Sequence, residues 1–217
     1  MADYVQQRMN MVDAQVRTND VTDPRIHAAM RDIPRERFVP PSRRAMAYAD
    51  ALIEVAPQRY LLDPRTFSKL LQLVEIRTSD KVLDVGCTTG YSSAVLARLA
   101  NSVVALEQDA DLVRVAVEAI ASVGATNTTV VQGQLADGCK EHAPYDVIFV
   151  NGGIQEQPER LLAQLGDGGR LAAILQSGTQ GRAELYVKEQ GRVGARGDFD
   201  ASVPPLAGFK KAVGFVF

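Results

Sequence analysis

Apolar positions near the start of the chain recur at helical spacing. An opening helix is predicted by four apolar residues separated by four, three and four positions: Val5, Met9, Val12 and Val16. Asp23-Pro24 and Asp63-Pro64 each combine a helix-capping residue with proline at the first helical position. The first predicts a short helix that contains Ile26 and Met30. The second precedes four apolar residues at i, i+3, i+4 and i+7: Phe67, Leu70, Leu71 and Val74.

From residue 81 the pattern changes to short apolar runs separated by helical stretches. Five strands are predicted, at 81–85, 102–107, 128–132, 145–150 and 171–175. Such alternation is typical of βαβ units with a mostly parallel sheet, and a helix at about 156–165 precedes the fifth strand. Two further strands, 183–187 and 212–217, are joined by a loop rich in Gly and Pro and should form an antiparallel edge. We therefore expect an α/β fold with a doubly wound sheet and a terminal hairpin.

Composition narrows the possible partners. Lys and Arg total 24 against 26 for Asp and Glu, so the net charge of −2 gives no reason to expect nucleic-acid binding. One short basic stretch, interrupted by Glu36, is interpreted as a solvated face: Arg35, Arg37, Arg43 and Arg44. The polar first ten residues and the absence of an apolar run near ~20 residues indicate a soluble, cytoplasmic protein without a membrane span.

The cysteines and histidines show no pattern of their own. Cys87 and Cys139 are expected to be free thiols, as suits a reducing cytosol. His27 and His142 stand apart from any group with metal-ligand spacing, and are interpreted as surface residues. We predict no metal site.

A candidate ligand loop lies between residues 82 and 91, where a strand runs through a glycine-bounded turn into a helix. Gly86 allows a positive φ and close approach of a ligand, and the helix N-terminus presents free N–H groups. The spacing Gly-x-x-x-Gly to Gly90 disfavours a dinucleotide, which would require Gly-x-Gly-x-x-Gly. Glu107 ends the next predicted strand, 21 residues after Gly86, where a carboxylate can accept both ribose hydroxyls of a nucleoside. The alternative is an ordinary surface glutamate at a strand end.

Several motifs along nearly the whole chain resemble the protein-L-isoaspartate O-methyltransferase family. They are Asp32–Val39, Ala47–Asp50, Val82–Gly90, Tyr145–Ile148, Gly168–Leu171 and, late in the chain, Val203–Leu206, which is similar to a Phe-Val-Pro-Leu segment of that family. The motif Pro34–Val39 is the most telling, because it lies outside the nucleoside-binding core that many methyltransferases share. The resemblance implies a single Rossmann-like class I methyltransferase domain with a seven-stranded sheet. Residues 1–79 would form an N-terminal helical and acceptor-loop segment, and 80–217 the cofactor-binding core.

The resemblance also implies S-adenosyl-L-methionine as cofactor, with Gly86, Gly90 and Glu107 at family binding positions. Asp84 matches an acidic position beside the cofactor; equally, it could be a strand-end carboxylate satisfied by helix N–H groups. The full set of expected cofactor-binding residues is Asp84, Gly86, Cys87, Thr88, Gly90, Tyr91, Glu107, Gln108, Gln134, Leu135 and Asn151.

The acceptor segment departs from the family pattern. Leu62 occupies the position of a serine that positions the substrate carboxylate in the family, and leucine cannot donate that hydrogen bond. Tyr60 lies two residues earlier, on the same side of an extended segment, so its phenol could replace the serine hydroxyl. The alternative is that Tyr60 packs against the core or caps a pocket with its ring.

Three further positions depart as well. Thr88 stands where the family has a second glycine, and Gln134 where it has an acid that faces adenine, although an amide oxygen can still accept from the adenine amino group. Asn151, before Gly152-Gly153, could contact an acceptor or form an Asn-Gly turn.

The expected activity is methyl transfer from S-adenosyl-L-methionine to a carboxylate. The resemblance implies isoaspartyl residues of damaged proteins as the acceptor, and hence a role in protein repair. Two alternatives remain open: a methyltransferase with a small-molecule acceptor, favoured by apolar Leu61 and Leu62, or a non-catalytic binding or scaffold protein on the same fold. The sequence does not fix the oligomeric state.

Overall fold

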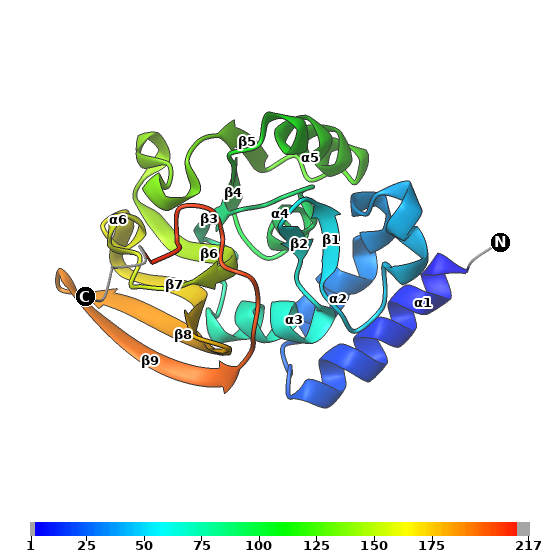
Figure 1. Cartoon of the computed structure of the whole chain (residues 1–217), viewed down its shortest axis with the longest axis horizontal. Helices are drawn as coiled ribbons and strands as arrows, with labels where there is room; N and C mark the ends of the chain where they lie inside the picture. The colour runs from blue at the N-terminus through cyan, green and yellow to red at the C-terminus, as the bar shows by residue number, and fades with distance from the viewer. Residues whose placement is uncertain (1–2, 212–217) are drawn as a thin grey trace, which may run out of the picture.

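One mixed sheet forms the centre of the molecule (Figure 1). The structure is a computed structural model that describes residues 3–211. Seven strands lie side by side in the order β5-β4-β3-β6-β7-β8-β9. Their bounds are β3 Lys81–Val85, β4 Ser102–Glu107, β5 Thr128–Gln132, β6 Tyr145–Ile154, β7 Leu165–Ser177, β8 Gln180–Glu189 and β9 Arg192–Asp200. The first five pair in parallel and the last two are antiparallel, which confirms the predicted mostly parallel sheet with a late hairpin.

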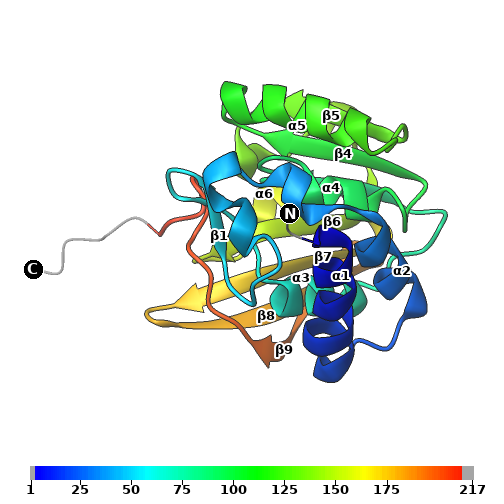
Figure 2. The same cartoon turned by 90° about the vertical axis from the view of Figure 1, so that its right-hand side faces the viewer.

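Helices and irregular turns cover both faces of the sheet (Figure 2). The helices are α1 Tyr4–Met11, α2 Pro24–Asp32, α3 Pro64–Leu73, α4 Tyr91–Leu96, α5 Ala110–Ser122 and α6 Glu159–Leu162. Because alternate strand residues point to opposite faces, Val82 and Phe149 join a hydrophobic cluster with α1 to α5, whereas Leu83 and Ile148 join a second cluster with α6. Asp84, two residues after Val82, therefore faces the same side as α4.

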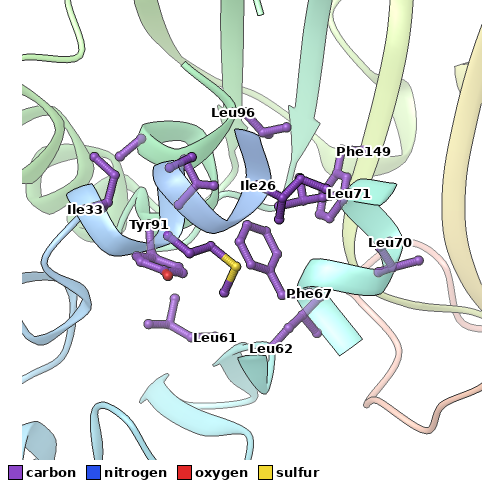
Figure 3. Packing of buried hydrophobic residues seen from close by; sticks show 14 of the residues in the cluster. Ile26, Ile33, Leu61, Leu62, Phe67, Leu70, Leu71, Tyr91, Leu96 and Phe149 are labelled. Carbon is purple, nitrogen blue, oxygen red and sulfur yellow. The ribbon is translucent and has the colours of Figure 1, made fainter. Parts of the chain in front are cut away.

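The helix starts predicted from Asp-Pro pairs are confirmed. Asp23 accepts a hydrogen bond from the backbone N–H of Arg25 at 2.8 Å, and Asp63 accepts one from that of Thr66 at 2.8 Å. The apolar face of α3 is buried as its spacing predicts, and Figure 3 shows Phe67, Leu70 and Leu71 packed in the core.

The predicted opening stripe is only half correct. Val12 and Val16 are fully buried, but Val5 is 62% exposed and Met9 37% exposed. A π-helical turn at Val12–Val16 follows α1, and its wider spacing changes which side of the helix faces the core. One continuous stripe cannot form across that change.

The terminal hairpin also differs from the prediction. It consists of β8 and β9, and β9 lies in the stretch expected to be a loop. Only Phe199 is buried in β9, so the strand has no alternating apolar pattern that a sequence could reveal. The predicted strand at 212–217 lies outside the described residues. The helix predicted at about 156–165 is only the single turn α6, because Leu165 already begins β7.

A small antiparallel hairpin, β1 Ile53–Ala56 and β2 Arg59–Leu61, joins the N-terminal helices to α3. In Figure 1 it lies next to α4 and the ends of β3 and β4. Two 3₁₀ segments, Arg35–Phe38 and Pro41–Met46, precede it. The interpretation of Arg35 as part of a solvated face is wrong, because its side chain is fully buried and hydrogen-bonded to backbone carbonyls. Among residues 3–211, no helix is long and apolar enough to cross a membrane.

Candidate active site

Three polar side chains meet where neighbouring strands end. Asp84 lies in β3, Glu107 ends β4, and Asn151 lies within the buried run of β6, which extends past the predicted end at residue 150 to Ile154. These strands are adjacent and parallel, so their carboxyl ends share one edge of the sheet, where open α/β sheets bind ligands. All three side chains are buried, with exposed fractions of 0%, 0% and 7%.

The turn after β3 has the backbone conformation that the glycine spacing predicts. Gly86 has φ of +80° and Gly90 has φ of +91°, a region that favours glycine. A Cβ on Gly90 would lie 2.8 Å from the Ile120 side chain, so close packing of the turn on α5 also requires glycine. Thr88, where the resemblance implies glycine, adopts φ of +52° and donates its backbone N–H to Glu107 Oε2 at 3.0 Å.

Both carboxylate oxygens of Glu107 accept hydrogen bonds from backbone and side-chain donors. Its Oε1 accepts from the backbone N–H groups of Gln108 at 2.8 Å and Asp109 at 3.1 Å. Arg59 of β2 then donates Nη1 to Oε1 at 2.6 Å and Nη2 to Oε2 at 2.5 Å, a bidentate pair. Sequence reasoning placed Glu107 in the site but missed Arg59. The one signal for it was a charged residue close to the apolar pair Leu61 and Leu62.

Asp84 is the hub of a second polar cluster. Its Oδ2 accepts from the hydroxyls of Ser92 at 2.7 Å and Ser93 at 2.5 Å, and its Oδ1 accepts a short hydrogen bond from Asn151 Nδ2. Burial raises the pKa of Asp84 to about 6, although these hydrogen bonds oppose the rise. The two serines at the start of α4 were not predicted, and Asn151 here contacts Asp84.

The predicted acceptor residues surround a very small cavity of about 10 Å³. Its lining includes Tyr60, Leu62, Asn151, Gly152 and Leu206. Leu62 is 4% exposed, and Figure 3 shows it beside Phe67. The Tyr60 hydroxyl lies 3.5 Å from Glu54 Oε1 on the other strand of the hairpin.

The remaining expected cofactor residues are dispersed. The Tyr91 ring packs in the core with centroids 5.7 Å from Phe38 and 5.6 Å from Phe67, so its side chain is not brought to Glu107 (Figure 3). Cys87 and Leu135 are fully buried, Gln108 is half-buried and Gln134 is exposed. Both cysteines are free, and burial raises the pKa of the Cys87 thiol. His27 is half-buried, its Nε2 2.7 Å from the Val21 carbonyl oxygen. Within 3–211, no group of three or more His, Cys, Asp or Glu side chains is placed to hold a metal ion.

The sheet order, the glycine turn and the strand-end carboxylates define a Rossmann-like methyltransferase fold. Two solved structures have this architecture with TM-scores of 0.80. One, a protein-L-isoaspartate O-methyltransferase, is 26% identical, and the alignment covers 93% of this chain and 66% of that one. The other, from Plasmodium falciparum and in complex with S-adenosyl-L-homocysteine, is 18% identical, with coverage of 94% and 99%.

The family model for Protein-L-isoaspartate(D-aspartate) O-methyltransferase matches residues 6–204, and the chain belongs to that family. Protein-L-isoaspartate O-methyltransferases from Methanoculleus marisnigri and Koribacter versatilis are 37% and 34% identical to it. The alignments cover 86% and 93% of this chain, and 85% and 90% of those proteins. The predicted family is thus confirmed, and the protein is by class an S-adenosylmethionine-dependent methyltransferase. Neither a small-molecule acceptor nor a scaffold role is favoured by these relatives.

Proposed function

We propose that this protein transfers a methyl group from S-adenosyl-L-methionine to the side-chain carboxylate of isoaspartyl residues in damaged proteins. The observation that carries the proposal is the family match over residues 6–204, which includes both the strand-end site and the acceptor segment. Relatives at 34–37% identity carry the corresponding name.

The chemistry of the strand-end residues suits a nucleoside cofactor. Glu107 supplies a carboxylate that can accept from ribose hydroxyls, and Gly86, with its positive φ and no side chain, allows a ligand to approach the backbone closely. Asp84 and the turn between β3 and α4 supply further polar groups at the carboxyl ends of the strands. The further positions proposed to line this site are Cys87, Thr88, Gly90, Tyr91, Gln108, Gln134, Leu135 and Asn151. The bound cofactor would supply an electrophilic methyl group on its sulfonium.

The protein must also position the substrate carboxylate oxygen that accepts the methyl group, and this oxygen needs no activation. A carboxylate with pKa near roughly 4 is already ionised at neutral pH, so orientation is the main contribution of the protein. With Leu62 in place of serine, we propose that Tyr60 supplies the orienting hydroxyl. A Tyr60→Phe variant should then methylate isoaspartyl peptide more slowly, whereas an unchanged rate would remove Tyr60 from this role.

We further propose that the whole chain works as one domain in the cytoplasm, in protein repair, with a protein or peptide as partner and no nucleic acid. The net charge of −2 and the two free cysteines agree with this setting.

The decisive experiment is a transfer assay with radiolabelled S-adenosyl-L-methionine and two peptides that differ only in an isoaspartyl or an aspartyl linkage. The proposal predicts base-labile methyl ester on the isoaspartyl peptide alone. Binding of S-adenosylhomocysteine without esterification of that peptide would contradict the acceptor but leave the cofactor. Absence of both binding and transfer would contradict the whole proposal.

A further inference from the structure

Arg59 and Glu107 form a buried ion pair at the place where the proposed cofactor ribose would be held. The two residues are 48 positions apart in sequence and come from β2 and β4. Their side chains are 8% and 0% exposed. Each guanidinium Nη atom donates to one carboxylate oxygen, Nη1 to Oε1 at 2.6 Å and Nη2 to Oε2 at 2.5 Å, so the pair has the fork geometry of strong arginine recognition.

This pairing leaves Glu107 no capacity for another donor. Its oxygens already accept from three backbone N–H groups, those of Thr88, Gln108 and Asp109. Adding the two donors of Arg59 brings the total to five, against about four lone-pair sites on a carboxylate. Two ribose hydroxyls would restore the same total of five donors, so they can replace the guanidinium on Glu107 but cannot be added beside it.

Leu206 fills the adjoining space. A Cβ placed on Gly86 would lie 3.1 Å from Leu206 Cδ1 and 3.4 Å from Arg59 Nη2, and one placed on Gly152 would lie 2.6 Å from Leu206 Cγ. The Leu206 backbone is held by its N–H bond to the Gly153 carbonyl at 2.9 Å. Leu206 also lines the small acceptor cavity of about 10 Å³ described above.

We propose that Arg59 is an internal competitor for the cofactor site, and that the structure shows the closed state. In this state the Arg59 guanidinium holds Glu107, while Leu206 covers Gly86. The cofactor binds to an open state in which the guanidinium has left Glu107. The inference rests on the ribose-binding role proposed above for Glu107. Since only the open fraction is competent, the observed affinity is the intrinsic affinity reduced by that fraction.

Calorimetric titration of the full chain with S-adenosylhomocysteine tests the competition. Arg59→Met keeps most of the side-chain length but removes every donor, so this variant should bind at least tenfold more tightly than the wild type. Arg170→Met is the matched control. Arg170 also forms a buried pair, with Asp80 at 2.5 Å. Asp80 precedes β3 and therefore lies at the amino ends of the strands, opposite to the carboxyl ends where Glu107 lies. That variant should leave the dissociation constant unchanged.

Two further measurements keep the test decisive if Arg59→Met does not fold. Arg59→Lys keeps the charge but cannot bind in a bidentate manner, and should also bind S-adenosylhomocysteine more tightly than the wild type. A crystal structure of the wild-type complex should show Arg59 beyond hydrogen-bond distance of Glu107. Equal or weaker binding by the Arg59 variants, or an intact pair in the complex, would overturn the inference.

The competition and the proposed function fail in different ways. Tighter binding by Arg59→Met, with no methylation of isoaspartyl peptide by either protein, would support the competition and contradict the acceptor. Methylation by the wild type, with the same dissociation constant in both proteins, would support the proposed acceptor and contradict the competition.

Discussion

The guanidinium of Arg35 donates a hydrogen bond to the backbone carbonyl of Leu62 at 2.6 Å. Its Nε donates to the carbonyl of Ala47 at 2.8 Å, and its Cζ lies 4.7 Å above the Tyr91 ring. Arg35 belongs to the Pro34–Val39 motif, and Leu62 stands at the acceptor position where the family resemblance implies serine. The motif that is most telling for the family therefore fixes the backbone of the segment that is predicted to depart from the family pattern.

Replacing Arg35 should destabilise the fold strongly. Arg35→Ala would leave the carbonyls of Leu62 and Ala47 without partners and remove a large buried side chain. We expect the free energy of unfolding to fall by about 3 kcal/mol or more. Arg37→Ala is the control, because Arg37 is exposed two residues away, and should stay within about 0.5 kcal/mol of the wild type. Urea unfolding measures both, and equal effects would show that the buried hydrogen bonds contribute little.

Local patterns explain why most of the sheet was predictable. β3, β4 and β5 have the residue bounds expected from sequence. β3 and β4 are buried parallel strands, which form continuous apolar runs between turn residues. β9 was missed since it lies at the edge with seven exposed residues in a row, and neither face carries an apolar repeat. The phase change after α1 was equally invisible, because Val5 and Met9 keep helical spacing although they face solvent.

Only the site residues at the ends of the parallel strands were predictable from sequence. Glu107 and Asp84 follow from strand ends, whose position at one sheet edge is a rule of parallel topology. Arg59 could not be assigned to Glu107, because their contact depends on how the β1–β2 hairpin docks against the sheet. Neither the length nor the composition of that hairpin determines the docking.

Introducing serine at position 62 tests whether a hydroxyl at this position limits catalysis. Leu62 is 4% exposed within the main hydrophobic cluster, so Leu62→Ser should reduce the free energy of unfolding by about 3 kcal/mol. Per folded molecule, however, it should methylate isoaspartyl peptide faster, by on the order of tenfold or more. Leu61→Ser, at an equally buried neighbour, should show the stability loss without the gain. If both variants are equally slow, the hydroxyl at position 62 is not what limits the rate.

The buried carboxyl of Asp84 should make stability depend on pH. Its pKa is raised to about 6 in the folded state, above the ordinary value of 3.8, so the folded protein holds this proton more tightly than the unfolded chain does. The resulting stabilisation is complete below about pH 4 and is lost as the pH rises to about 6, at up to roughly 1.4 kcal/mol per pH unit. Asp84→Asn lacks this term. Between pH 4 and 6, the free energy of unfolding of the wild type should therefore fall relative to that of the variant, as measured in urea titrations. A difference that stays constant over this range would contradict the raised pKa.

The close contact between Gly152 and Leu206 should be sensitive to a single methyl group. A Cβ at position 152 would lie 2.6 Å from Leu206 Cγ, so Gly152→Ala must displace Leu206 or strain the backbone of β6. We expect a loss of about 1–3 kcal/mol in the free energy of unfolding. Gly194→Ala is the matched control, because a Cβ there meets nothing within 4 Å, and its stability should change by less than about 0.5 kcal/mol. Since Leu206 also covers Gly86, the displacement should change the affinity for S-adenosylhomocysteine in Gly152→Ala but not in Gly194→Ala. The same affinity in both variants would show that Leu206 does not restrict the site.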